Sequence, residues 1–280
     1  MSANARGILF MLLFTLVLPF NDAITKILLT DYDAGQLLGL RFAYLIVLLG
    51  LPGLFLPATE IMAPPNRPLL LLRGVLIASA SMFYVSSLAY LSLASVTAIS
   101  MLFPLIVTAV SPFVLGERVG PIRYAMVGVG FIGALLVIQP TTSGLGKGEL
   151  LALGAPLCFS TYVLMTHRMS GRGTKLGQLF WTSLGAVVIT GIAAWMNWRE
   201  PDALGWGLII LTSILAMIIY ILQIASLSAG EASVVVPFNY AALGTATAVG
   251  YLFWGDIPNA LAIAGIVLIA LSGVVIAVRS

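Results

Sequence analysis

Charged residues are scarce in this chain of 280 residues: 13 are basic, 10 are acidic, and together they make up 8% of the sequence. Soluble domains carry about a quarter of their residues as charges. So few charges cannot solvate the surface of a globule of this size, and most of that surface must therefore face lipid. A soluble enzyme, a nucleic-acid-binding protein and a disordered chain are all disfavoured, and we expect no nucleic-acid partner.

Cysteine and histidine occur once each, as Cys158 and His167. One cysteine excludes a disulfide framework, and one histidine excludes the usual histidine-rich or cysteine/histidine metal clusters. The sequence also lacks an H-E-x-x-H motif and an aspartate-rich metal motif. An intramembrane enzyme needs a positioned acid, base or metal. We therefore expect a protein that is not an enzyme and that holds no metal or cofactor.

Apolar residues are abundant instead, at 60% of the sequence. Ten apolar runs of roughly 20 residues recur, each long enough to cross about 30 Å of hydrocarbon. We predict an all-α integral membrane protein with ten transmembrane helices joined by short loops. The predicted spans are Gly7–Leu29, Gly35–Leu56, Pro68–Ser92, Ala94–Leu115, Ile122–Ile138, Leu150–Met169, Leu176–Trp198, Ala203–Leu227, Ala232–Gly255 and Pro258–Val278.

The basic residues fall unevenly on the two sides of these predicted spans. Nine of the 13 lie on the side of the N-terminus and four on the other. Because loops rich in lysine and arginine stay in the cytoplasm, both termini are predicted to be cytoplasmic, in a multi-pass protein of the inner membrane. The lipid bilayer is its expected partner. The sequence leaves the oligomeric state open, with a monomer as one option.

The two halves of the sequence repeat. Gly35-Gln36-Leu37 opens the second predicted span, and Gly177-Gln178-Leu179 opens the seventh. The repeat divides the chain into residues 1–140 and 141–280, with five predicted spans in each half. Five is odd, so the second half enters the membrane from the opposite face and the two repeats are inverted. Inverted repeats favour alternating-access transport, although duplication for packing alone remains an alternative.

A short corner, Gly116-Glu117-Arg118, lies between the fourth and fifth predicted spans, and Gly255-Asp256-Ile257 stands at the matching place in the second half. With ten spans in two inverted units, the chain resembles the drug/metabolite transporter superfamily with tandem EamA-type domains. It is most similar to the YddG-type exporters of aromatic and other neutral amino acids. The resemblance implies export from the cytoplasm by alternating access through a central cavity.

Four prolines lie inside predicted spans and pair across the repeat: Pro19 with Pro156, and Pro104 with Pro237. A proline removes a backbone donor, kinks its helix and frees a carbonyl. Interruptions at matching places in both halves indicate a substrate site near the middle of the membrane, together with hinges. The alternative is that membrane helices tolerate proline in general.

Aromatic and polar side chains also match across the repeat. Tyr84 aligns with Tyr220 and Ser87 with Gln223, so each half carries an aromatic and a hydrogen-bonding residue on one helix face. We predict that these four residues line the cavity. The alternative is hydrogen bonding between helices, which is common for serine and glutamine in membrane bundles.

Further polar residues lie within a helical turn of the prolines: Asn21 near Pro19, and Asn239 and Tyr240 near Pro237. Polar groups in hydrocarbon need partners, and a wet cavity supplies them. We predict that these three residues also line the cavity, where aromatic rings would pack on an amino-acid side chain and polar groups would meet its ammonium and carboxylate.

Asp22 and Lys26 are four residues apart in the first predicted span, on one helix face. Because an ionised carboxylate inside the bilayer is costly, the pair is a candidate proton site, ammonium partner or outer gate. The alternative is that the two side chains satisfy each other, with Lys26 reaching toward the membrane surface.

The predicted function is a secondary transporter that exports aromatic and other neutral amino acids or similar small metabolites. The alternatives are a multidrug or other-metabolite exporter and, less favoured, a passive channel. A dianionic cargo such as a sugar phosphate would call for several basic residues at mid-span. Only Arg41 and Arg73 come close to that position.

Overall fold

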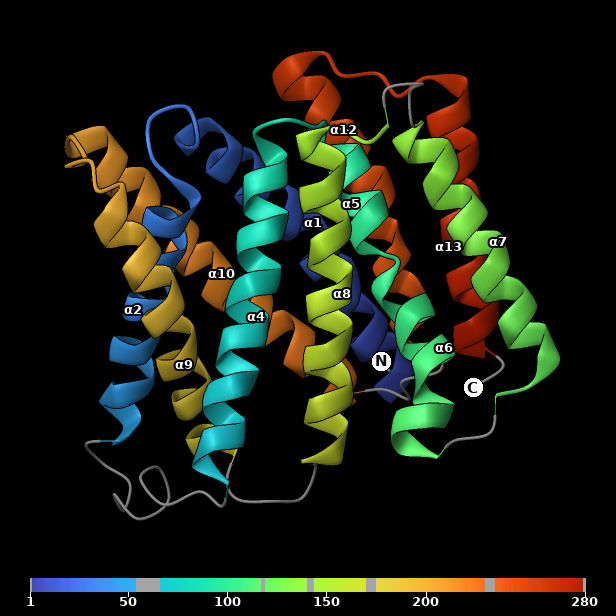
Figure 1. The fold of residues 1–280 in the computed structure, drawn as a ribbon, viewed down its shortest axis with the longest axis horizontal. Helices are drawn as coiled ribbons and strands as arrows, with labels where there is room; N and C mark the ends of the chain where they lie inside the picture. Colours follow the sequence, from blue (N-terminus) through green and yellow to red (C-terminus); the bar gives the residue numbers. More distant parts are fainter. Residues whose placement is uncertain are drawn as a thin grey trace.

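A computed structural model describes residues 2–53, 66–116, 119–139, 144–169, 175–229 and 235–278. Helices account for most of them (Figure 1). In chain order these are α1 (Ala3–Leu28), α2 (Ala34–Gly53), α4 (Arg67–Leu88), α5 (Leu93–Ser100), α6 (Phe103–Leu115), α7 (Pro121–Ile138), α8 (Lys147–Arg168), α9 (Lys175–Met196), α10 (Ala203–Ala229), the 3-10 helix η1 (Val236–Tyr240), α12 (Ala241–Trp254) and α13 (Ala260–Val278).

Seven helical segments of the described part are long and apolar enough to cross a membrane, counting α5 and α6 as one segment. Two shorter apolar segments, Ala34–Val47 and Phe180–Met196, lie in α2 and α9. The prediction of an all-helical, multi-spanning membrane protein is therefore confirmed. Glu117 and Arg118 of the predicted corner lie outside the described residues.

The predicted fourth span, Ala94–Leu115, is interrupted next to Pro104, as the paired prolines indicated. Helix α5 ends at Ser100, a two-residue turn follows, and α6 begins at Phe103. Pro104 in the first turn of α6 has no N–H to continue the hydrogen-bond ladder of α5. The predicted ninth span departs from an α-helix at the matching proline, because Pro237 lies in the first turn of the 3-10 helix η1, which leads directly into α12 at Ala241.

Helix pairing follows a matched pattern across the two halves of the chain. Helix α1 packs along α10, and α8 packs along α4 in the same manner. Helices α2 and α9 form a pair at one edge of the bundle, and α7 and α13 form a pair at the other (Figure 1). Helix α1 begins, and α13 ends, at the same end of the bundle (Figure 1). We call this end the termini side and the opposite end the far side.

Glycines set two features of this architecture. Gly116 and Gly255 each follow a helix with φ of +73° and +69°, a left-handed conformation that ends α6 and α12 alike. Gly133 and Gly265 lie where α7 and α13 touch, and a Cβ on Gly133 would come within 2.8 Å of the Gly265 carbonyl oxygen. The backbones of α7 and α13 therefore meet closely enough to exclude any side chain, as in small-residue membrane contacts.

Candidate functional site: a central cavity

A cavity of about 250 Å³ lies inside the bundle. Its wall is formed by α1, α2 and α4–α6 from the first half of the chain and by α8, α10 and η1 from the second. The wall is mainly apolar, and six aromatic side chains face the space. These are Phe14, Phe42, Tyr84, Phe103, Phe159 and Tyr220.

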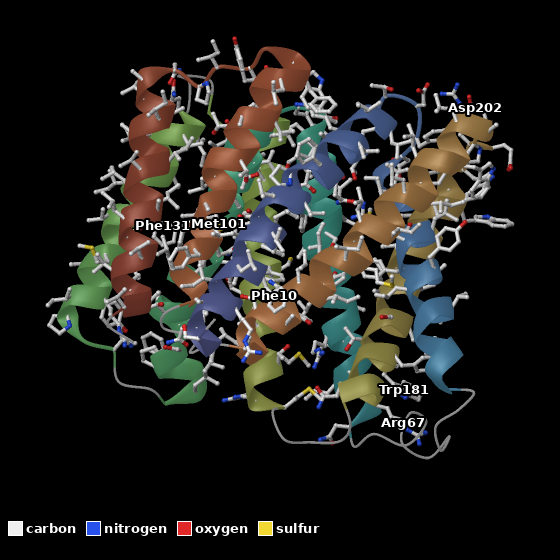
Figure 2. The ribbon with its side chains drawn as sticks, turned by 180° about the vertical axis from the view of Figure 1, so that it is seen from behind. Phe10, Arg67, Met101, Phe131, Trp181 and Asp202 are labelled. Atoms are coloured by element: carbon white, nitrogen blue, oxygen red, sulfur yellow. The ribbon has the colours of Figure 1, made fainter. Side chains whose placement is uncertain are left out.

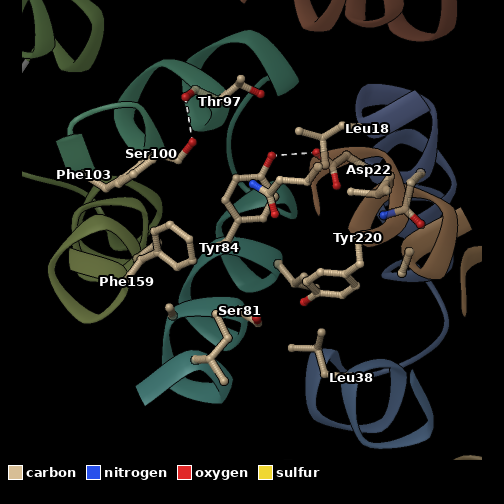
Figure 3. A pocket seen from close by; sticks show the side chains of 18 of the residues that line it. Leu18, Asp22, Leu38, Ser81, Tyr84, Thr97, Ser100, Phe103, Phe159 and Tyr220 are labelled. Carbon is tan, nitrogen blue, oxygen red and sulfur yellow. Dashed lines mark hydrogen bonds between the residues drawn. The ribbon is translucent and has the colours of Figure 1, made fainter. Parts of the chain in front are cut away.

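The interrupted helices bring residues to this cavity. The break between α5 and α6 places Ser100, Met101 and Phe103 at the wall. The Phe103 ring packs edge-on against Phe159 of α8, with ring centroids 4.9 Å apart. The Ser160 hydroxyl of α8 is shared between the Pro156 carbonyl of its own helix at 2.6 Å and the Phe103 carbonyl at 3.1 Å, so it also links the break to the second half of the chain. Phe103 and Phe159 line the same cavity as Tyr84 (Figure 3).

An acid lies at one side of the cavity. Asp22 of α1 is buried, and its Oδ2 accepts a hydrogen bond of 2.7 Å from the hydroxyl of Tyr84 on α4 (Figure 3). One hydroxyl satisfies only part of a carboxylate, which has about four acceptor positions. Asp22 therefore keeps free acceptor capacity that a cationic donor in the cavity can use.

A basic residue, Arg41, also lines this cavity, and it was not singled out from the sequence as a site residue. Arg41 of α2 donates one hydrogen bond from Nη2 to Thr25 Oγ1 at 3.1 Å, while its buried Nε has no partner in the described part of the structure. Among the described residues, no ion pair joins Arg41 to Asp22. The signal for Arg41 was its depth in a predicted span, but only packing shows that it faces the same cavity as Asp22.

The cavity wall holds most of the unsatisfied polar atoms. Five buried side-chain atoms of the described residues have no hydrogen-bond partner, and three of them belong to the wall. These three are Asn21 Oδ1, Arg41 Nε and Asn239 Oδ1. Buried polar atoms are normally paired with protein or water. An apolar cavity with three unsatisfied polar atoms is therefore suited to a ligand that is itself both apolar and polar.

Five of the seven residues predicted from the sequence to line the cavity do lie in its wall: Asn21, Tyr84, Tyr220, Gln223 and Asn239. Ser87 does not, because its short side chain turns back and donates to the Tyr84 carbonyl at 2.7 Å. Gln223, at the matching position, is long enough to reach the wall. Tyr240 lies against Gly273 of α13 in the hydrophobic core.

The four prolines lie at distinct places around the site. Pro156 lines the cavity, whereas Pro104 and Pro237 lie in the interrupted helices described above. Pro19 is buried in α1 and frees the carbonyl of Thr15, which accepts a hydrogen bond of 2.6 Å from Thr245 on α12. The hinge role of these prolines stays a prediction.

Asp22 and Lys26 do not pair with each other. Asp22 accepts from Tyr84, whereas Lys26 donates from Nζ to the Leu91 carbonyl at 2.7 Å and lies 5.0 Å from the ring centroid of Trp254. Lys26 therefore joins the far-side end of α1 to α12 and to the chain between α4 and α5. Its separation from Asp22 leaves the acid available to the cavity.

On the far side of the bundle, polar contacts join the two halves of the chain. Gln36 of α2 holds the backbone of Arg199 through two hydrogen bonds of 2.6 and 3.0 Å, and the Arg199 side chain pairs with Asp31 at 3.3 Å. Helices α1 and α2 also pack against α4. The matching packing of α8 and α9 against α10 is not found to the same extent among the described residues.

Known proteins resemble this chain over nearly its full length. The model of the EamA-like transporter family matches it twice, over residues 5–139 and 146–278. The pseudopaline exporter CntI of Pseudomonas aeruginosa is 24% identical over 268 residues, which cover 95% of this chain and 94% of the exporter. The S-adenosylmethionine uptake transporter of Rickettsia prowazekii is 21% identical, with 94% of this chain and 90% of the transporter covered.

Two further matches extend this picture. A riboflavin transporter of Rhizobium johnstonii is 28% identical over 189 residues, which cover 67% of this chain and 63% of the transporter. A solved crystal structure superposes with a TM-score of 0.64 at 19% identity and covers 99% of this chain and 98% of its own. At that identity, the crystal structure supports the fold alone.

Proposed function

Because the chain belongs to the EamA-like transporter family, we propose that it is a secondary transporter that exports neutral amino acids with aromatic or other apolar side chains. It is a multi-pass membrane protein, and its relatives carry small molecules. The proposal places it in the inner membrane with both termini in the cytoplasm, as the distribution of basic residues favours. We expect transport without catalysis.

The observation that carries this proposal is that an acidic residue, Asp22, and a basic residue, Arg41, line the same aromatic cavity and form no ion pair with each other. Asp22 suits an ammonium group, and Arg41 suits a carboxylate, because a guanidinium binds carboxylates with paired N–H donors. The aromatic wall suits an apolar side chain. A zwitterionic amino acid satisfies all three features at once, whereas a purely apolar or a doubly negative molecule does not.

The size of the cavity favours a small cargo. Pockets for drug-sized ligands measure about 300–1,000 Å³, and this cavity measures about 250 Å³. The competing proposal is an exporter of a larger metabolite or of several drugs, and the full-length likeness to an exporter of pseudopaline favours it. A substrate panel that includes both classes of molecule separates the two proposals.

Alternating access is the proposed mechanism. The matched packing of α1 on α10 and of α8 on α4, together with the opposite directions of α1 and α8 in Figure 1, supports two inverted repeats. The polar contacts on the far side and the weaker packing of α8 and α9 against α10 support a state in which the cavity faces the termini side. If α1 and α2 moved away from α4 while α8 and α9 packed against α10, the cavity would open to the far side instead.

Counterflow in proteoliposomes tests the proposal. The panel contains labelled phenylalanine, phenethylamine, which lacks the carboxylate, and 3-phenylpropionate, which lacks the ammonium. We expect phenylalanine to exchange fastest, because only phenylalanine engages both Asp22 and Arg41. Phenylalanine flux equal to that of empty liposomes would rule out amino-acid export. Flux without counterflow would indicate a passive channel, and efflux of dyes with no preference among the panel would favour a multidrug exporter.

A further inference from the structure

A second arginine is buried outside the cavity, on the termini side. The side chain of Arg73 on α4 is 3% exposed. Its Nη1 donates to Gln178 Oε1 of α9 at 3.1 Å, and its guanidinium carbon lies 5.3 Å from the ring centroid of Tyr162 on α8. Its Nε is buried without a partner, and no carboxylate pairs with it among the described residues.

A row of aromatic rings connects Arg73 to the cavity. Phe103 packs edge-on against Phe159, with centroids 4.9 Å apart, and both rings line the cavity. Phe159 stacks on Tyr162, with centroids 5.6 Å apart and an angle of 24° between the rings. Tyr162 in turn lies against the Arg73 guanidinium. The row therefore leads without interruption from the cavity wall to the buried cation.

Arg73 also shares a helix face with the cavity-lining residues of α4. Ile77, Ser81 and Tyr84 follow it by four, eight and eleven residues, which places them on the same face. At 1.5 Å per residue, Arg73 lies about 16 Å along the helix axis from Tyr84. Arg73 is thus aligned with the cavity but lies closer to the termini side.

Arg41 and Arg73 are similar in their surroundings. Arg41 is seven residues into α2 from the far side, and Arg73 is six residues into α4 from the termini side. Each lies about 10 Å from the start of its helix. Each donates to one neutral acceptor, Thr25 or Gln178, and each leaves a buried Nε unpaired. Both therefore retain donors for an anionic ligand.

A buried guanidinium without a carboxylate is costly, because its lost hydration is not replaced by an opposite charge. A neutral amide oxygen such as Gln178 Oε1 is a weaker acceptor for it than a carboxylate oxygen. We propose that Arg73, Tyr162 and Gln178 form a second carboxylate-binding site, on the termini side of the cavity, for an aromatic carboxylate cargo. The cargo carboxylate replaces Gln178 Oε1 on Arg73, its ring packs beside Tyr162, and the cargo then moves along the rings toward Arg41.

The site itself follows from the residues around Arg73, whereas the identity of its cargo rests on the proposed function. Binding of benzoate tests the site independently of transport, since benzoate carries the ring and the carboxylate but no ammonium. Equilibrium binding of labelled benzoate to the purified full chain is expected to give about two sites per chain, one at each arginine. Arg73→Gln and Arg41→Gln should each leave about one.

A matched control is available on the same helix. Arg67 at the start of α4 is exposed and lies over Trp181, 5.2 Å from its ring centroid, at the termini side (Figure 2). Arg67→Gln removes the same charge and should leave the number of benzoate sites unchanged. Acetate should compete at least tenfold more weakly than benzoate, because it has no ring to pack beside Tyr162. Equal competition by acetate, or by inorganic phosphate, would contradict an aromatic carboxylate site.

Thermal melting separates this role from a structural one. If Arg73 served only to join α4 to α9, Arg73→Gln would lower the melting temperature. Relief of an unpaired buried charge predicts a melting temperature equal to or above that of the wild type. Arg73→Lys keeps the charge but loses the paired donors, so it should bind benzoate with intermediate affinity.

The outcomes distinguish the site from the proposed function. If Arg73→Gln still bound about two benzoate molecules per chain, the second site would be overturned, whatever the protein transports. Loss of one benzoate site in Arg73→Gln, in a protein that fails to exchange phenylalanine, would support the site and contradict amino-acid export. If phenylalanine is exchanged, the apparent KM for exchange should rise at least fivefold in Arg73→Gln, with no change in Arg67→Gln.

Discussion

At the scale of single residues, the cavity depends on polar groups that are only partly satisfied. Asp22 has one hydroxyl partner, Arg41 uses one of its five N–H groups in a hydrogen bond, and Asn21 and Asn239 each have an oxygen without a partner. Buried polar atoms of this kind destabilise a fold unless a ligand or water completes them. Their concentration at one cavity is therefore evidence for binding rather than for stability.

Tyr84→Phe tests the role of the hydroxyl beside Asp22. The substitution keeps the ring in the cavity wall but removes the hydrogen bond of 2.7 Å to Asp22 Oδ2. Leaving a buried carboxylate without this donor should lower the free energy of unfolding by about 1–3 kcal/mol and weaken phenylalanine exchange. Thermal melting and counterflow measure the two effects. Phe159→Leu, which changes the wall without touching Asp22, is the comparison, and equal losses in both variants would argue against a specific role of the hydroxyl.

At the scale of helices, proline positions were visible in the sequence, but their consequences were not all predictable. Pro104 and Pro237 mark where helices are interrupted, whereas α1 and α8 continue through Pro19 and Pro156. The sequence did not show that the freed Thr15 carbonyl would be satisfied by Thr245, because that contact depends on how α12 packs on α1. The short side chain of Ser87 and the burial of Tyr240 against Gly273 likewise follow from packing rather than from spacing.

Thr245→Val tests the contact that satisfies the Thr15 carbonyl. Valine has nearly the same shape, so the change chiefly removes the hydrogen bond of 2.6 Å between α12 and α1. We expect a loss of about 1–3 kcal/mol in the free energy of unfolding, because a buried carbonyl loses its donor. Thr247→Val is the matched control, since Thr247 donates only to the Leu243 carbonyl of its own helix. Thermal melting in one detergent compares the pair, and equal shifts would contradict the proposed importance of the contact between helices.

Gly133→Ala tests the close contact between α7 and α13. The new Cβ would lie 2.8 Å from the Gly265 carbonyl oxygen and 3.0 Å from Leu268 Cβ, so the two helices must move apart. Overpacking of this kind costs about 1–3 kcal/mol. Gly128→Ala on the same helix meets no atom within 4 Å and should be neutral or slightly stabilising. A melting temperature of Gly133→Ala at or above that of Gly128→Ala would contradict the close approach.

At the scale of the whole molecule, the sequence predicted the membrane class and the family resemblance, and both are confirmed. Apolar run length and repeated motifs are local properties that a sequence displays directly. The partnership of Asp22 with Arg41 at one cavity was not predictable, because the two residues lie on different helices and only the packing of α1 and α2 against α4 brings them together. The ten-helix inverted repeat stays a prediction.

The packing of the whole molecule determines from which side of the membrane the cavity is accessible, and thiol labelling tests this. Ser81 lines the cavity, and Cys158 is the chain's single cysteine. Ser81→Cys in a Cys158→Ser background should therefore react with a membrane-impermeant thiol reagent applied from the termini side. The contacts of Gln36 and Asp31 with Arg199 should block the same reagent from the far side.

Loosening the far-side closure should change the direction of access. Gln36→Leu removes both hydrogen bonds to the Arg199 backbone while keeping a side chain of similar size. In alternating access, destabilising one closed end shifts the population toward the state that is open there. Labelling of Ser81→Cys from the far side should rise, and labelling from the termini side should fall. Thr30→Val, which removes the hydrogen bonds of Thr30 to the Ile27 carbonyl and to Asp31 but leaves both Gln36 hydrogen bonds in place, is the control. Equal labelling from both sides, in the protein with Gln36 and in the Gln36→Leu variant alike, would indicate an open channel instead of a carrier.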